Sequence, residues 1–190
     1  MTSLELEERA RRYAAEREIK IFFRKPLGHG TDGSVWPTNR NSAVKSLKLQ
    51  KNYLPERLCY QRLAERGVQS IDGLAVPKLI DFDDRLMVVE IEIVEPPYLL
   101  DFGKAYIDET APFTQEELAA YNASLAAQFR QEDIPRVRKI CRLLGAYGIE
   151  YLDAKPANIR LRTDKEEREL PDDDWDREPP LAVPVDDSDR

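Results

Sequence analysis

Hydrophobic and polar residues follow two different periods along the chain. Alternation and short apolar runs predict strands at 18–26, 34–36, 42–49, 79–82, 85–94 and 158–162. Helical spacing predicts helices at 54–66, 114–132 and 134–147, and either a surface helix or a mobile arm at 3–19. The chain therefore places several strands and one helix before a mainly helical part.

This order predicts an α+β fold with four successive segments. A helical arm at 1–17 precedes a β-rich part at 18–95, which contains one helix. A smaller, mainly helical part follows at 96–175. An acidic, proline-bearing tail at 176–190 is expected to be disordered, because it has too little apolar surface to bury.

The composition narrows the class of protein. Of the 190 residues, 42% are hydrophobic and 34% are charged, and the formal net charge is −7. This charge argues against electrostatic binding to nucleic acid or to anionic membrane lipid. No apolar run reaches the roughly 18 residues of a membrane span, and the first residues lack the apolar region of a signal peptide. We therefore expect a cytoplasmic protein whose two cysteines, Cys59 and Cys141, are reduced.

A glycine-rich segment lies between the first two predicted strands. Gly28, Gly30 and Gly33 have the spacing G-x-G-x-x-G, but a strand follows them instead of the helix that a dinucleotide-binding site needs. A β-hairpin that folds over phosphate groups fits this context, because glycines let backbone N–H groups approach the phosphate oxygens. An ordinary flexible hairpin fits the loop too.

Lys45 stands among apolar residues of the strand that follows this loop. A lysine on a partly buried strand needs a partner of opposite charge. A phosphate beneath the hairpin would serve, and so would Glu56, one turn inside the next predicted helix. Glu65 is an alternative near the end of that helix, while alternation directs Lys48 away from Lys45, toward solvent.

The loop after the last predicted helix carries an acid, a lysine and an amide in close succession. Gly148 ends the helix, and the chain then reads Leu-Asp-Ala-Lys-Pro-Ala-Asn-Ile from Leu152 to Ile159. Taken in order with the glycine loop, Lys45 and the helical glutamate, this motif resembles the motifs of the protein kinase-like superfamily. The resemblance extends over residues 20–158.

The resemblance implies a kinase-like fold, with a β-rich lobe at 18–95 and a reduced, mainly helical lobe at 96–175. It also implies that ATP and Mg²⁺ are bound between the lobes. In the loop, Asp153 would accept the proton of the attacking hydroxyl group, and Asn158 would help to hold Mg²⁺. Lys155 would neutralise charge on the transferred phosphoryl group.

The nucleotide-binding positions that the resemblance implies lie in the hairpin, the strands beside it and the following helix. They are Gly28, Gly30, Gly33, Val35, Lys45, Glu56 and Glu90. The glycines would cover the triphosphate, and Lys45 would contact the α- and β-phosphates and pair with Glu56. The adenine would lie against the strand end at 90–94, held by backbone groups.

The second metal ligand departs from the family pattern. No Asp-Phe-Gly follows Asn158, so we expect an aspartate within 172–174, represented by Asp173, to bind Mg²⁺. The alternative is that these acids form a solvated tail. The triplet Asp101-Phe102-Gly103 precedes the loop, which is the wrong order for the metal-binding motif. We interpret that triplet as a packing segment.

Two functions remain open from the sequence, besides a coincidental match in an unrelated α+β protein. The first is a small, bacterial-type ATP-dependent phosphotransferase, whose acceptor is a protein Ser/Thr or a small-molecule hydroxyl group. The second is a pseudokinase, a nucleotide-binding or regulatory interaction module. Tyr151 and Leu152 replace the family's His-Arg pair, and the chain ends at Arg190. We therefore expect neither a phosphorylated activation loop nor the usual platform for peptide substrates.

Overall fold

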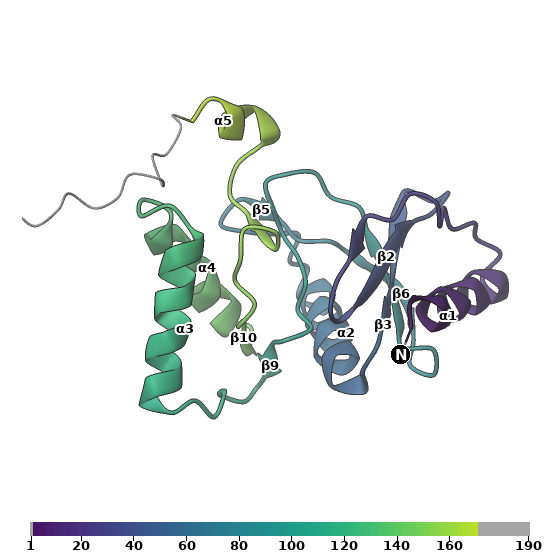
Figure 1. Cartoon of the computed structure of the whole chain (residues 1–190), viewed down its shortest axis with the longest axis horizontal. Helices are drawn as coiled ribbons and strands as arrows, with labels where there is room; N and C mark the ends of the chain where they lie inside the picture. Colours follow the sequence, from purple (N-terminus) through teal and green to yellow (C-terminus); the bar gives the residue numbers. More distant parts are fainter. Residues whose placement is uncertain (1, 171–190) are drawn as a thin grey trace, which may run out of the picture.

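The chain folds around a five-stranded antiparallel sheet at one end of the molecule (Figure 1). The computed structural model describes residues 2–170. The strand order is β1-β2-β3-β7-β6. The five strands are β1 (Gly28–His29), β2 (Gly33–Pro37), β3 (Ser42–Leu47), β6 (Leu79–Asp83) and β7 (Val88–Glu92). The fold is mixed α+β, as predicted.

Helix α1 (Ser3–Glu16) packs on one face of this sheet (Figure 1). Its buried residues Leu6, Ala10 and Tyr13 form one hydrophobic cluster with side chains of the sheet, including Trp36 and Val44. Thr2 caps the helix by accepting a hydrogen bond from the backbone N–H of Glu5. Of the two alternatives for this segment, the structure has a packed helix and not a mobile arm.

Helix α2 (Gln50–Glu65) covers the other face of the sheet. Side chains alternate between the two faces along β3, so Val44 faces α1 while Ala43 joins the cluster that contains Tyr60 and Leu63 of α2. Lys45 lies on this second face as well, where it meets α2. The face of the sheet under α2 is therefore the one that can present Lys45 to a ligand.

The rest of the described chain forms a helical part that small strands join to the sheet end. Helices α3 (Gln115–Gln128) and α4 (Ile134–Gly145) lie at the opposite end of the molecule from α1 (Figure 1). A short helix, α5 (Asp164–Arg168), follows. A two-stranded sheet pairs β9 (Tyr106–Ile107) with β10 (Ile149–Glu150).

A third sheet has four strands in the order β11-β8-β5-β4. It comprises β4 (Ser70–Ile71), β5 (Leu74–Ala75), β8 (Tyr98–Leu99) and β11 (Ile159–Arg160). These two-residue strands bring the segment at 98–103 beside the loop at 152–158, with Leu99 opposite Ile159. This pairing positions the candidate site.

One hydrophobic cluster runs through both parts of the molecule. It includes Ala43 of the sheet, Leu63 of α2 and Val137 of α4. The core is thus continuous across the boundary predicted between residues 95 and 96, and that boundary stays a prediction. No helix within residues 2–170 has the length and apolar character needed to cross a membrane.

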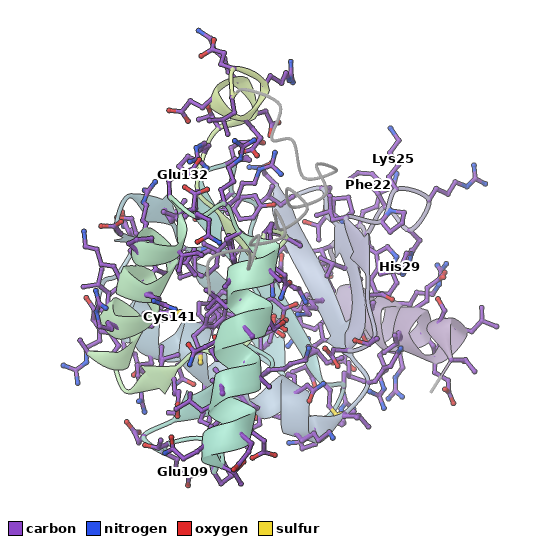
Figure 2. All side chains as sticks on the ribbon, turned by 60° about the vertical axis from the view of Figure 1, so that its left-hand side comes forward. Phe22, Lys25, His29, Glu109, Glu132 and Cys141 are labelled. Atoms are coloured by element: carbon purple, nitrogen blue, oxygen red, sulfur yellow. The ribbon has the colours of Figure 1, made fainter. Side chains whose placement is uncertain are left out.

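The two cysteines are free thiols, as expected. Cys59 is fully buried in α2. Cys141, on α4, is half-buried near residues of α3 (Figure 2). Burial raises the pKa of the Cys141 thiol to about 11. At neutral pH this thiol therefore stays protonated and unreactive.

The strand predicted at 18–26 is wrong. The backbone makes a single bridge there, between Ile21 and Thr38. A turn in which the N–H of Lys25 donates to the carbonyl of Phe22 interrupts the segment, and Pro26 follows. Ile19 and Ile21 are nevertheless buried in the cluster under α1, which accounts for the apolar pattern.

Most other predicted elements are present with shifted ends. Helix α2 begins at Gln50 and not at Leu54, so Pro55 lies inside the helix. The strand predicted at 85–94 shortens to Val88–Glu92, because a turn with Met87 at a φ of 51° precedes it. Gly148 follows α4 at a φ of +71°, a left-handed conformation that favours glycine and ends the helix.

Candidate functional site

A cavity of about 350 Å³ lies between the five-stranded sheet and the four-stranded sheet that contains β8 and β11. Its roof contains Gly28 and Val35 from the glycine hairpin. Its charged and amide lining residues are Lys45, Glu56, Glu92, Asp101 and Asn158. Ala43, Ile91, Ile93 and Tyr98 give the remainder an apolar wall. An apolar cavity with a few convergent charged groups is the usual form of a small-molecule site.

Lys45 forms a buried ion pair with Glu56. The ammonium nitrogen lies 2.8 and 2.7 Å from the two carboxylate oxygens, so the helical partner predicted from the sequence is confirmed. Burial alone would lower the pKa of Lys45, but the charges of Glu56 and Asp101 outweigh burial and raise it. Lys45 therefore remains charged at any physiological pH.

Asp101 also reaches Lys45, which corrects the interpretation of the Asp-Phe-Gly triplet. Its carboxylate lies 3.0 Å from the lysine nitrogen. Phe102 and Gly103 are buried and do pack, but the side chain of Asp101 lines the cavity. The residue has a φ of 58°, a left-handed conformation that aspartate tolerates better than most residues. The triplet is therefore both a packing segment and part of the site.

Asp153 lies in the loop after β10, and three side chains contact its carboxylate. Lys155 lies 2.7 Å from one carboxylate oxygen, and the side-chain amide of Asn158 donates to the same oxygen at 2.8 Å. Lys104 lies 3.0 Å from the other oxygen. Burial alone would raise the pKa of Asp153, but hydrogen bonds from Lys155 and Lys104 outweigh burial and hold that pKa below its usual value.

The loop owes its shape to its own backbone. The N–H groups of Asn158 and Ile159 both donate to the carbonyl of Lys155, each at 2.9 Å, which closes a tight turn. The Asn158 amide adds a bond to the carbonyl of Asp153 at 2.9 Å. Tyr151, just before the loop, donates its hydroxyl to the carbonyl of Leu100 at 2.8 Å. The structure thus brings together Asp153, Lys155 and Asn158, as the sequence predicted.

The three loop glycines differ in their surroundings. A Cβ atom added at Gly33 would lie 2.3 Å from the backbone oxygen of Ser46, so the pairing of β2 with β3 requires glycine there. A Cβ at Gly28 would meet nothing within 4 Å, and one at Gly30 would meet a single atom at 3.9 Å. Packing within the chain therefore explains Gly33 but leaves Gly28 and Gly30 unexplained.

Glu90, one of the predicted nucleotide-binding positions, does not line the cavity, which corrects that prediction. In the β3–β7 pairing Glu90 lies opposite Val44, so it points to the α1 face, away from Lys45. There it is fully buried and accepts hydrogen bonds from the hydroxyls of Tyr13, at 2.9 Å, and Ser42, at 2.5 Å. Glu90 therefore stabilises the packing of α1, and the part of this segment that lines the cavity is Ile91 to Val94.

His29 has no place in the cavity lining. Its ring is exposed at the outer edge of the sheet, where it contacts Ser34 and Trp36 (Figure 2). Asp173, the predicted metal ligand, lies outside the described residues.

Oxygen atoms suited to a metal ion are nevertheless present within residues 2–170. Asn158 uses its amide nitrogen for both hydrogen bonds to Asp153, so its side-chain oxygen accepts none from a described residue. The second carboxylate oxygen of Asp101 likewise accepts none from this part of the chain. Carboxylate and amide oxygens are the ligands that Mg²⁺ takes. The described residues contain no group of three or more His, Cys, Asp or Glu side chains that could hold a metal ion without further ligands.

Sequence reasoning missed two residues of the site, Asp101 and Lys104. The triplet that contains Asp101 was the available signal, and its position before the loop concealed it. Lys104 follows this triplet directly, so the same placement would have found it.

Compared with protein-family models and with curated proteins, the chain shows no match.

Proposed function

We propose that this protein is a cytoplasmic ATP-dependent phosphotransferase of the protein kinase-like superfamily. The observation that carries the proposal is that the Lys45–Glu56 pair and Asn158, whose side-chain amide holds Asp153, line one cavity together with Gly28 of the glycine hairpin. These groups come from four separate segments, and a purely structural protein has no need to gather them around a cavity.

In the proposed complex, Lys45 contacts the phosphates of ATP while Glu56 holds it in position. The open space at Gly28 and Gly30 lets backbone N–H groups approach the phosphate oxygens. The adenine lies against the apolar wall formed by Ala43, Ile91 and Ile93. This arrangement accounts for the cavity's division into an apolar part and a charged part.

Asp153 orients the acceptor hydroxyl group and takes its proton. Lys155 and Lys104, at 2.7 and 3.0 Å from the Asp153 carboxylate, place two positive charges where the transferred phosphoryl group carries negative charge. Asn158 offers its side-chain oxygen to Mg²⁺, which neutralises phosphate charge when it is bound. Most of the rate enhancement would then come from positioning and electrostatics.

One observation favours the alternative function, a nucleotide-binding regulatory module. Lys155 and Lys104 lower the pKa of Asp153, and a base with a lowered pKa takes up a proton less readily. A module of this kind would bind ATP in the same cavity without transferring phosphate. The two functions therefore differ in turnover and not in binding.

The test combines nucleotide binding with phosphate transfer. ATP with Mg²⁺, at 100 times its dissociation constant, should stabilise the folded protein by about 2.7 kcal/mol. Transfer of labelled γ-phosphate to water, to the protein itself or to an added hydroxyl acceptor measures turnover. Asp153→Asn should abolish transfer and leave binding nearly intact, whereas Lys45→Ala should weaken both.

Each outcome decides between the readings. If no nucleotide stabilises the wild-type protein, the phosphotransferase and the nucleotide-binding module are both wrong, and only a regulatory module that binds no nucleotide remains. Binding without any transfer would select the regulatory module. Transfer by Asp153→Asn at the wild-type rate would refute the role assigned to that residue.

A further inference from the structure

We propose that Asp101 is the carboxylate ligand of the Mg²⁺ ion at this site, opposite Asn158, although it precedes the Asp153 loop in the chain. The assignment rests on the proposed function, because the remaining ligands would be phosphate oxygens of the nucleotide and water. It names a residue that the sequence order had excluded. Four observations in the structure support it.

The first observation is the strand pairing that brings Asp101 to the site. Strand β8 runs antiparallel to β11, with Leu99 opposite Ile159 and Tyr98 opposite Arg160. The next residue, Leu100, donates its N–H to the carbonyl of Asn158 at 2.8 Å. Asp101 therefore leaves the strand pair at the end where Asn158 enters it, and both side chains line the same cavity.

The second observation concerns the free oxygen atoms. One oxygen of Asp101 accepts from Lys45 at 3.0 Å and from the N–H of Gly103 at 3.4 Å. The other oxygen, like the side-chain oxygen of Asn158, has no donor among residues 2–170. Asn158 is 5% exposed and lines the cavity, so its side-chain oxygen is available to a ligand bound there.

The third observation is the charge around Lys45. This single cation lies between two carboxylates, Glu56 at 2.7 Å and Asp101 at 3.0 Å. Glu56 is 1% exposed and holds the lysine from within the core, whereas the side chain of Asp101 is 30% exposed toward the cavity. Of these two carboxylates, Asp101 is therefore the one that a nucleotide-bound cation can reach.

The fourth observation is that Asp101 is fixed in place. Its backbone N–H donates to the hydroxyl of Tyr60 in α2 at 3.3 Å. The next side chain, Phe102, is fully buried between Tyr60 and Tyr151, with ring centroids 5.0 and 5.5 Å apart. These edge-to-face aromatic contacts connect α2, Asp101 and the Asp153 loop, so the carboxylate is preorganised before any cation arrives.

The described residues fit the demand of Mg²⁺ for few protein ligands. Mg²⁺ in nucleotide sites is bound through one or two carboxylates together with phosphates and water, and not by a cage of protein side chains. One carboxylate and one amide oxygen meet that demand. The competing candidates are Asp172, Asp173 and Asp174, and the experiment has to separate them from Asp101.

The experiment measures how much Mg²⁺ strengthens ATP binding. The dissociation constant of ATP is determined for the full chain by titration calorimetry in Mg²⁺ and in EDTA, and bound Mn²⁺ is counted by electron paramagnetic resonance in the presence of ATP. The test variants are Asp101→Asn and Asp101→Gly, because asparagine and glycine both accept a φ of 58°. A triple Asp→Asn variant at 172–174 tests the competing aspartates.

Asp108→Asn is the matched control. Asp108 also has a φ of 58° and also pairs with a basic side chain, Arg62, at 2.6 Å, but it does not line the cavity. It follows Asp101 in the same segment, so it reports the general effect of removing an aspartate there.

In both Asp101 variants we expect the gain in ATP affinity from Mg²⁺ to fall by at least about tenfold. ATP binding in EDTA should stay equal or become tighter, since a negative charge facing the phosphates is lost and Lys45 is released. A merely structural role would weaken binding in both conditions. Asp108→Asn and the triple variant should keep the gain and the bound Mn²⁺ of the wild type.

Three results would overturn the assignment while leaving the proposed function intact. They are a full Mg²⁺ gain in both Asp101 variants, an equal loss of affinity with and without Mg²⁺, and a loss of the Mg²⁺ gain confined to the triple variant. A wild-type protein that binds no ATP in either condition would instead refute the proposed function, and the assignment with it.

Discussion

Replacing Lys45 by methionine tests the electrostatics of the cavity most directly. The methionine preserves the length of the apolar stem but removes the only cation that contacts Glu56 among the described residues. Glu56 is 1% exposed, so its carboxylate cannot turn to water. Breaking a buried pair by removing one partner costs about 3–5 kcal/mol, and we expect the free energy of unfolding at neutral pH to fall by that amount.

The pH dependence gives this prediction a sign as well as a size. Burial raises the pKa of Glu56 above its ordinary value even while Lys45 opposes the effect. Without Lys45 the pKa in the folded state rises further, so the folded protein binds a proton that the unfolded chain releases. Stability of Lys45→Met should therefore increase as the pH falls from the folded-state pKa toward the unfolded value of about 4.3, by up to about 1.4 kcal/mol per pH unit.

Urea denaturation at about pH 5.5 and about pH 7.5 measures both effects. Adding Glu56→Gln to Lys45→Met should recover most of the loss at the higher pH, because the buried charge is gone. Lys104→Met serves as a control: Lys104 also pairs with a carboxylate, but its side chain is 48% exposed and its loss should cost at most about 1 kcal/mol. A loss below about 1 kcal/mol in Lys45→Met, or a stability that decreases on acidification in this range, would refute the reasoning.

Four further substitutions have predictable outcomes. Gly30→Ala should leave the melting temperature unchanged, since its Cβ would meet a single protein atom at 3.9 Å, but it should weaken ATP binding by obstructing the phosphates. Gly33→Ala should destabilise the fold, because its Cβ would clash with a backbone oxygen. Phe102→Ala should cost about 3–5 kcal/mol in urea denaturation, as expected for a buried aromatic side chain. Tyr13→Phe should cost about 1–3 kcal/mol by the same measurement, because it leaves buried Glu90 without one of its two donors.

The sequence predicted those parts of the site that rest on local patterns. Lys45 and Glu56 were matched because strand alternation and helical spacing each fix the direction of a side chain over a few residues. The loop from Asp153 to Asn158 was recognisable for the same reason, since a short turn keeps its polar groups together. Helix α3 begins after Thr114, whose side chain accepts from the N–H of Glu117, and Thr-Gln-Glu-Glu at 114–117 is a sequence pattern typical of such a helix start.

Features that depend on pairing between distant strands were not predictable. The face on which Glu90 lies is set by its register opposite Val44, and a single sequence does not contain that register. Strands β8 and β11 are two residues each, too short to show a period. Their pairing brings Asp101 to the cavity. The Asp-Phe-Gly triplet was therefore visible in the sequence, but its position beside the cavity was not predictable.

The pairing of β8 with β11 also determines when the cavity can form during synthesis. The ribosome delivers the sheet, α2 and β8 first, and a nascent chain folds from its N-terminal side. Until Ile159 has emerged, β8 has an unpaired edge and Leu100 lacks the carbonyl of Asn158 as its acceptor. The carbonyl of Leu100 also lacks its donor at this stage, because the Tyr151 hydroxyl lies 51 residues later in the chain. The early part of the chain can thus bury Lys45 against Glu56 while it is still being made, but the complete cavity exists only once β11 has left the ribosome.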